Sequence, residues 1–163
     1  MKLNIGAGSY PLEGFENLDL PEFDMKKLPW PYKGESISMI VMGHVLEHVP
    51  RKNAMKVLRE AKRVLEPGGV IHIAVPDMDL YIDAVEDNNQ FILDKFPYRS
   101  LDSLLGGGDG EPRIEMRHRY LWCFGSLWYA LMLVGFKDIR QVEFGKYDNP
   151  TTMGWALQVE AIA

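Results

Sequence analysis

Two glycines and an aspartate lie where the backbone could hold a nucleotide-like ligand. Gly6 and Gly8 flank Ala7 directly after the first apolar stretch, and Asp19 follows the next one. Glycines after a first strand let the backbone approach a ligand closely. A dinucleotide site would need a third glycine where this sequence has Pro11, and an acid about 20 residues on. Since Asp19 comes 13 residues after Gly6, no full crossover helix fits between them, and a ligand without a pyrophosphate fits better.

A second group consists of His44, Glu47 and His48, which have the spacing of an inverted zinc-protease motif. On a helix, histidines at positions i and i+4 share one face. A zinc ion would need another ligand from elsewhere in the chain, and no second segment has a recognisable zinc-ligand motif. The motif also reaches Pro50 two residues later. We therefore expect no metal ion here, and assign His44 either to the wall of a ligand pocket or to packing at a helix start.

A local basic cluster is formed by Arg113, Arg117, His118 and Arg119, in a chain whose net charge is −5. It adjoins residues 89–117, the least regular part of the sequence, which we expect to act as a lid or binding segment. The cluster could recognise an anionic ligand, with His118 as a general base because imidazole titrates near neutral pH. A solvated loop face is the alternative.

The elements that must position these residues alternate between strand and helix. Residues 54–65 have apolar side chains at helical spacing, and Pro67-Gly68-Gly69 is expected to end this helix. Because the helix connects two apolar strands, those strands should be parallel neighbours. The expected strands are 3–5, 15–20, 39–42, 70–75, 139–144 and 155–162, and the other expected helices are 79–88 and 126–134.

This order predicts an α/β fold with a Rossmann-like doubly wound sheet. The sheet should be mostly parallel, with an antiparallel late strand and a shortened first crossover. Ligands of such sheets bind beyond the C-terminal ends of the strands, at the point where the strand order reverses. The residues expected at those ends are Gly6 to Gly8, Asp19, Gly43, His44 and Asp77.

Taken together, these motifs resemble the class I S-adenosylmethionine-dependent methyltransferases over most of the chain. The nearest likeness is to a compact subgroup with a shortened first crossover. Asn4 stands where the first motif of the family usually has an acid. The segments that carry the resemblance are Leu3–Gly8, Asn17–Leu20, Asp24–Trp30, His44–Val49, Arg63–Gly69 and Gly135–Phe136.

The resemblance implies S-adenosylmethionine as cofactor and S-adenosylhomocysteine as product. Asp19 would accept hydrogen bonds from both ribose hydroxyls, and Asp24 would accept one from the adenine amino group. The Met25 amide would contact the adenine ring, and Leu20 would pack against it. The remaining cofactor contacts would be Asn4, Gly6, Ala7, Gly8 and Gly43, and the candidate catalytic residues are His44 and His118.

Structural roles remain open for several of these residues. Asp19 could be a solvated turn acid, Asp24 could cap the segment after it, and Asn4 could be purely structural. Asp77 could be the N-cap of the next helix. His72, in the middle of an expected strand, is assigned to packing.

Composition narrows the class of protein. An acidic chain with 25% charged residues lacks the basic field of a non-specific nucleic-acid binder, so we expect no nucleic-acid partner. A single Cys123 favours a reducing compartment, which we take as the cytoplasm. The longest apolar stretch, 121–134, is shorter than the roughly 18 residues of a membrane span, and the N-terminus does not read as a signal peptide. The length predicts one domain over residues 1–163, with 89–117 as its lid or acceptor-side segment.

The function expected from the sequence is methyl transfer to a small-molecule or saccharide-linked acceptor, which would be anionic if the basic cluster contacts it. One alternative is a catalytically degenerate fold that only binds the cofactor or a partner, favoured by Asn4 and the absent first crossover helix. A nicotinamide dehydrogenase is disfavoured by the missing third glycine. The identity of the acceptor, the methylated atom and the oligomeric state are left open.

Overall fold

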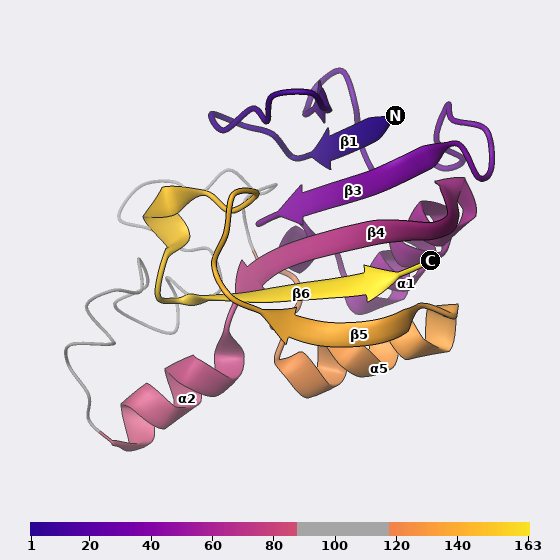
Figure 1. Ribbon diagram of the computed structural model, residues 1–163. Coiled ribbons are helices and arrows are strands. Elements are labelled where there is room, and N and C mark those ends of the chain that lie inside the picture. The colour runs from indigo at the N-terminus through magenta and orange to yellow at the C-terminus, as the bar shows by residue number, and fades with distance from the viewer. Residues whose placement is uncertain (88–117) are drawn as a thin grey trace.

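The computed structural model describes residues 1–87 and 118–163. The predicted lid segment 89–117 lies outside the described residues. The described strands form one six-stranded sheet in the order β2-β1-β3-β4-β6-β5 (Figure 1). The strands are β1 (Lys2–Ile5), β2 (Glu16–Leu18), β3 (Ile37–Gly43), β4 (Leu65–Pro76), β5 (Lys137–Val142) and β6 (Ala156–Ile162). The helices are α1 (Arg51–Val64), α2 (Met78–Glu86) and α5 (Phe124–Val134), with short 3-10 helices η1 (Leu46–His48) and η3 (Pro150–Thr152).

The sheet has the predicted mixed topology. Strands β2, β1, β3 and β4 run parallel, and β6 is antiparallel to both β4 and β5. The predicted Rossmann-like α/β class is therefore confirmed. The chain passes from β1 to one neighbour, β2, and then returns to the other side as β3, so the strand order reverses at β1. Residues 6–15, between β1 and β2, form no helix, which confirms the shortened first crossover.

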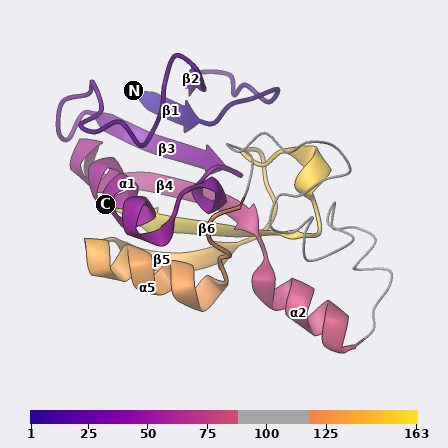
Figure 2. The same cartoon turned by 180° about the vertical axis from the view of Figure 1, so that it is seen from behind.

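Helices α1 and α5 lie side by side on one face of the sheet (Figure 2). The apolar side of α1 faces β3 and β4 because its apolar residues recur at helical spacing. The buried residues of these helices are Ala54, Val57, Leu58, Ala61 and Val64 in α1, and Leu127, Ala130 and Leu131 in α5. Gly135, at φ +96°, ends α5 as the sequence predicts.

The opposite face of β3 is also covered, although by loop residues. Met39 and Val41 pack there against Leu12, while Ile40 and Met42 belong to the core beneath the helices. Side chains alternate between the two faces of a strand, so an unbroken apolar run indicates that both faces are buried. This interpretation of residues 39–42 is confirmed.

The end of α1 differs from the prediction. The helix stops at Val64, and Leu65 already adopts the extended backbone of β4 and pairs with Ile37. The observed end lies shortly before the predicted stop at Pro67-Gly68-Gly69, and these three residues belong to β4 because Leu65 already pairs with Ile37. A proline disfavours helical backbone at the residue before it, here Glu66. The segment therefore becomes the irregular start of β4, where the register with β3 shifts.

Glu60 of α1 holds the loop that forms one wall of the candidate site. Its carboxylate accepts a hydrogen bond from the Trp30 amide at 2.7 Å and is bound by Arg63 through Nε at 3.0 Å and Nη2 at 2.6 Å. The Trp30 indole then donates to the Met25 carbonyl at 3.0 Å and packs edge-on against Phe23. Helix α1 thereby fixes the position of the loop that contains Met25.

Replacing Glu60 by glutamine is expected to lower the free energy of unfolding by about 1–3 kcal/mol at neutral pH, because a charge-assisted network is lost. The hydrogen bonds from Arg63 lower the pKa of the Glu60 carboxyl. Its contribution is therefore fully present above the ordinary glutamate pKa of about 4.3 and is lost as the pH falls through the folded value. Urea unfolding at stepped pH should show the gap between wild type and variant closing below about pH 4.

Glu66→Gln is the matched control, since Glu66 is an exposed glutamate just beyond the same helix. Its unfolding free energy should stay within about 0.5 kcal/mol of wild type at every pH. An equal loss in both variants would contradict the role given to Glu60.

None of the helices in residues 1–87 and 118–163 is long and apolar enough to cross a bilayer.

Candidate functional site

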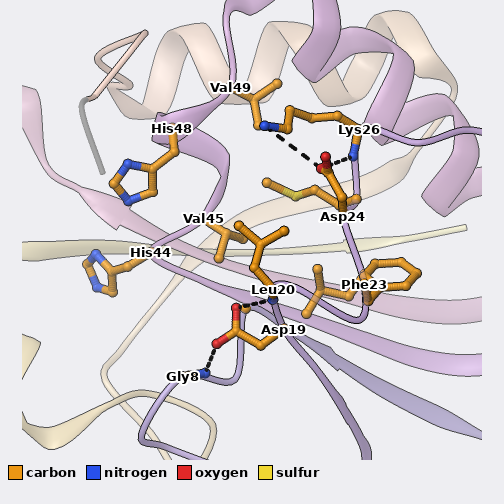
Figure 3. Close-up of a pocket in the computed structure, with 13 residues that line it drawn as sticks. Gly8, Asp19, Leu20, Phe23, Asp24, Lys26, His44, Val45, His48 and Val49 are labelled. Atoms are coloured by element: carbon orange, nitrogen blue, oxygen red, sulfur yellow. Dashed lines mark hydrogen bonds and ion pairs between the residues drawn. The ribbon is translucent and has the colours of Figure 1, made fainter. Parts of the chain in front are cut away.

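A cavity of about 220 Å³ opens at the C-terminal ends of β1, β2 and β3 (Figure 3). The turn after β1, the loop after β2 and the segment after β3 supply its walls. This is the edge of the sheet at which the sequence predicts a ligand. The lining residues are Ile5, Gly6, Gly8, Asp19, Leu20, Phe23, Asp24, Met25, Lys26, His44, Val45, His48 and Val49.

Asp19 follows β2 directly, and its carboxylate faces the turn after β1. One oxygen accepts a hydrogen bond from the Gly8 amide and the other from the Leu20 amide, both at 2.8 Å (Figure 3). The Leu18 carbonyl accepts from the Gly6 amide at 2.7 Å, which ties the same turn to the end of β2. The carboxylate is therefore held in one orientation at the cavity wall, and its oxygens have lone pairs for further donors.

The two glycines of the turn are needed for different reasons. Gly6 lies at φ +76° and Gly8 at φ +46°, a backbone region that favours glycine. A Cβ at Gly6 would also overlap the side chain of Val45, lying 3.1 Å from the Val45 Cβ. A Cβ at Gly8 would meet only an Asp19 oxygen, at 3.8 Å. Gly6 thus permits close packing within the protein, whereas Gly8 leaves the cavity side of the turn open.

Leu20, Asp24 and Met25, from the loop after β2, also line this cavity. Leu20 is 51% exposed, so its side chain is accessible to a ligand. Asp24 accepts a hydrogen bond from the Lys26 amide at 3.0 Å and lies 3.9 Å from the Lys26 ammonium. Asp24 therefore caps the following segment, which is the structural role left open for it by the sequence. It also lines the cavity.

Asn4, Ala7 and Gly43 do not line this cavity. They border a second hollow of about 180 Å³, which shares Gly6, Gly8 and His44 with the first. The Asn4 amide donates to the Asn17 side chain at 2.8 Å and to the Tyr10 carbonyl at 3.2 Å. Asn4 thus fixes the loop between β1 and β2, which supports its structural alternative.

His44 lies between the two hollows and lines both. Its backbone has φ +53°, and its amide donates to the Ala74 carbonyl at 2.8 Å. Its ring packs against Trp155, with centroids 4.9 Å apart and the ring planes tilted by 50°. His44 Nδ1 lies 3.3 Å from Oε1 of Glu47, which is fully buried. Burial raises the pKa of the Glu47 carboxyl, but His44 and His48 lower it more, so this pKa lies below its usual value.

The predicted basic cluster is only partly described. Arg113 and Arg117 lie outside the described residues. His118 is buried and packs edge-on against His48, with ring centroids 5.0 Å apart, and it is not among the lining residues of either hollow. Arg119 is exposed, and its amide donates to the Glu47 carbonyl at 2.6 Å. The structure therefore brings His118 to the far side of His48 rather than to the cavity wall.

Two further residues have structural contacts. Asp77 is the N-cap of α2 and accepts from the amides of Asp79 and Leu80 at 3.1 and 3.3 Å, which confirms its structural alternative. Burial raises the pKa of the Asp77 carboxyl. His72 is buried in β4, with Nε2 2.8 Å from Asp148.

Several lining residues have no signal in the sequence. Phe23 lies outside every motif, and Val45, although inside the segment His44–Val49, had no predicted role. Tyr147, which borders the second hollow, and Trp155, which packs against His44 without lining either hollow, both follow His44 by more than 100 positions. Only the strand order brings these segments to the same edge. Glu47 was noticed in the sequence, but its complete burial could not be inferred there.

Residues 7–73 match the family model described as a methyltransferase domain. That segment contains Ala7 and Gly8 of the turn, Asp19, the loop with Asp24 and Met25, and His44. No curated protein matches the sequence.

Solved structures share the fold. A SAM-dependent methyltransferase from Archaeoglobus fulgidus superposes with a TM-score of 0.60 at 11% identity, covering 99% of this chain and 85% of that one. A second, from Thermotoga maritima, gives a TM-score of 0.56 at 14% identity and covers 91% of this chain and 64% of that one. The chain thus spans less than two thirds of the Thermotoga protein. Residues 7–73 are thus similar to a methyltransferase domain, and the fold of the chain is that of solved SAM-dependent methyltransferases.

Proposed function

With residues 7–73 matching a methyltransferase domain, we propose that this chain transfers the methyl group of S-adenosylmethionine to a small-molecule or saccharide-linked acceptor. The observation that carries the proposal is the Asp19 carboxylate, which the amides of Gly8 and Leu20 hold at the cavity wall. A fixed carboxylate beside an open glycine turn suits a ligand with neighbouring hydroxyl donors.

The residues of the cavity fit the parts of this cofactor. Asp19 accepts hydrogen bonds from the two ribose hydroxyls, while Leu20 and Met25 pack against the adenine. Asp24 accepts from the adenine amino group. The second hollow, bordered by Ala7 and Gly43 on the other side of the turn, takes the methionine portion.

When bound, S-adenosylmethionine supplies an activated methyl group on a sulfonium centre. The chain then has to position the acceptor and take up its proton. His44 suits this role because it lines both hollows and its Nε2 is buried, with no hydrogen-bond partner within residues 1–87 and 118–163. Nδ1 of the same ring faces Glu47 Oε1 at 3.3 Å, so Nε2 is the nitrogen left to accept the acceptor's proton.

Calorimetric titration with S-adenosylhomocysteine tests the proposal. We expect one binding event per chain, whereas NADH should give none. Transfer of a radiolabelled methyl group is then measured over a panel of hydroxylated, carboxylated and saccharide acceptors. A chain that does not bind S-adenosylhomocysteine contradicts the proposal. A chain that binds it tightly but methylates no acceptor favours the alternative of a cofactor-binding module.

A further inference from the structure

We propose that Glu47, His48 and His118 form a binding site for a single divalent ion of the zinc class. One ligand atom from each of the three side chains lies within 4.8 Å of the other two. The sequence predicts no metal, because the motif of His44, Glu47 and His48 lacks a ligand from another segment. The fold supplies that ligand as His118, which is 70 positions further along the chain.

Glu47 is the strongest reason to place a cation here. Its side chain is 1% exposed, and neither carboxylate oxygen has a hydrogen bond to any residue that the structure describes. An ionised carboxylate in the protein interior is costly unless it is paired or coordinates a metal. One oxygen, Oε1, lies 3.3 Å from His44, a separation beyond good hydrogen-bond geometry. Oε2 can therefore coordinate an ion without displacing His44.

The two imidazoles are already arranged around this carboxylate. His48 follows Glu47 in η1, and its ring lies edge-on to His118 with centroids 5.0 Å apart. The amides of Arg119 and Tyr120 both donate to the Glu47 carbonyl, at 2.6 and 3.2 Å. These backbone bonds hold the segment that begins at His118 against η1. The three side chains thus come from two segments that are firmly joined.

The ligand set suits zinc better than a hard cation. Two imidazoles and one carboxylate are used in zinc sites that keep a fourth position open, whereas calcium and magnesium prefer oxygen ligands. Ligand atoms bound about 2.0–2.1 Å from a tetrahedral ion lie roughly 3.4 Å apart. Side-chain rotations that move the ligand atoms by about 1 Å would bring them to this spacing, and His48 is only partly buried and lines the cavity.

The first test uses the complete chain without a histidine tag, freed of metal with a chelator. Addition of Zn²⁺ should give one bound equivalent by calorimetry and raise the midpoint of thermal unfolding, since an ion that binds only the folded state stabilises it. Co²⁺ should give the visible absorption of a site with nitrogen and oxygen ligands. If Zn²⁺ neither binds stoichiometrically nor raises the midpoint, the proposal is wrong.

Variants then identify the ligands. His118→Ala and Glu47→Gln should each weaken Zn²⁺ binding by at least roughly 100-fold, since even loss of an outer-shell contact costs 10- to 100-fold. Glu66→Gln is the matched control for Glu47→Gln, because Glu66 is an exposed glutamate that is not one of the three ligands. Its Zn²⁺ affinity should stay within about threefold of wild type. His44→Asn leaves the three ligands in place but removes an outer contact of Glu47, so it should weaken Zn²⁺ binding less than His118→Ala does. Circular dichroism of the metal-free protein checks that each variant is folded. If a variant is unfolded, the Co²⁺ absorption spectrum of the wild type tests the proposed nitrogen and oxygen ligands instead.

Loss of Zn²⁺ binding in His44→Asn, with binding retained in His118→Ala, would place the ion at the sequence motif and overturn the proposed trio. These measurements need neither cofactor nor acceptor. A failure of the metal site is therefore distinct from a failure to bind S-adenosylhomocysteine.

Discussion

Replacing Asp19 by alanine is expected to weaken S-adenosylhomocysteine binding by about 2–4 kcal/mol, or roughly 30- to 900-fold, because two charge-assisted hydrogen bonds to the ribose are lost. The fold should remain intact, since Asp19 is at the surface of the sheet edge and its protein partners are two backbone amides. Calorimetric titration of a variant with a normal circular dichroism spectrum measures the effect.

Asp19→Asn should weaken S-adenosylhomocysteine binding nearly as much as Asp19→Ala does. Each carboxylate oxygen faces a backbone N–H, that of Gly8 or that of Leu20. In asparagine, an NH₂ group replaces one of the two oxygens and must face one of these N–H groups. The hydrogen bond from that N–H is then lost, and two hydrogen-bond donors face each other. Glu22→Ala is the control, as an exposed acid of the same loop that does not line the cavity. Cofactor affinity unchanged in Asp19→Ala would exclude the ribose role.

Gly6→Ala should have the largest effect on stability, lowering the free energy of unfolding by about 2–5 kcal/mol. Positive φ costs a non-glycine residue about 1–2 kcal/mol, and overpacking adds about 1–3 kcal/mol. The new Cβ would overlap Val45, so the turn and the segment after β3 must move apart. Both line the cavity, and cofactor binding should fall with stability. Urea unfolding and calorimetry measure the two effects.

Gly8→Ala separates the two causes. Its φ is also positive, but its Cβ would meet nothing closer than 3.8 Å. We expect only the backbone cost of about 1–2 kcal/mol. In the background of Val45→Ala, the Gly6→Ala change should cost less, which a double-mutant cycle quantifies. Equal losses at Gly6 and Gly8 would show that Val45 contributes nothing.

Local sequence signals predicted most of the fold. The apolar spacing in residues 54–65 and the unbroken apolar run at 39–42 identified a helix and a doubly covered strand, and both are present. Element ends were less predictable. The helix stops at Val64 because the start of β4 competes for Leu65, and that competition depends on pairing with Ile37, which is remote in sequence.

The candidate site was predictable where its residues follow strands directly. The residues after β1, β2 and β3 could be assigned to one edge because parallel strands bring their ends together. Asn4 was a weaker prediction, since alternation along β1 places it on the side of the second hollow, where it binds Asn17. The trio of Glu47, His48 and His118 could not be predicted, because its third member comes from a distant segment without a motif.

The order of strands has a consequence for synthesis on the ribosome. β6 is the strand neighbour of β5, yet it follows β5 in the chain by about 20 residues, which take roughly 1–4 s to translate. During that time the hydrogen-bonding groups of β5 are open to pairing with other nascent chains. Lys137 and Arg140 are charged, and the register of β5 shifts between them. Charges and such irregularities discourage edge-to-edge pairing, so the features that protect the finished edge also protect β5 while it waits for β6.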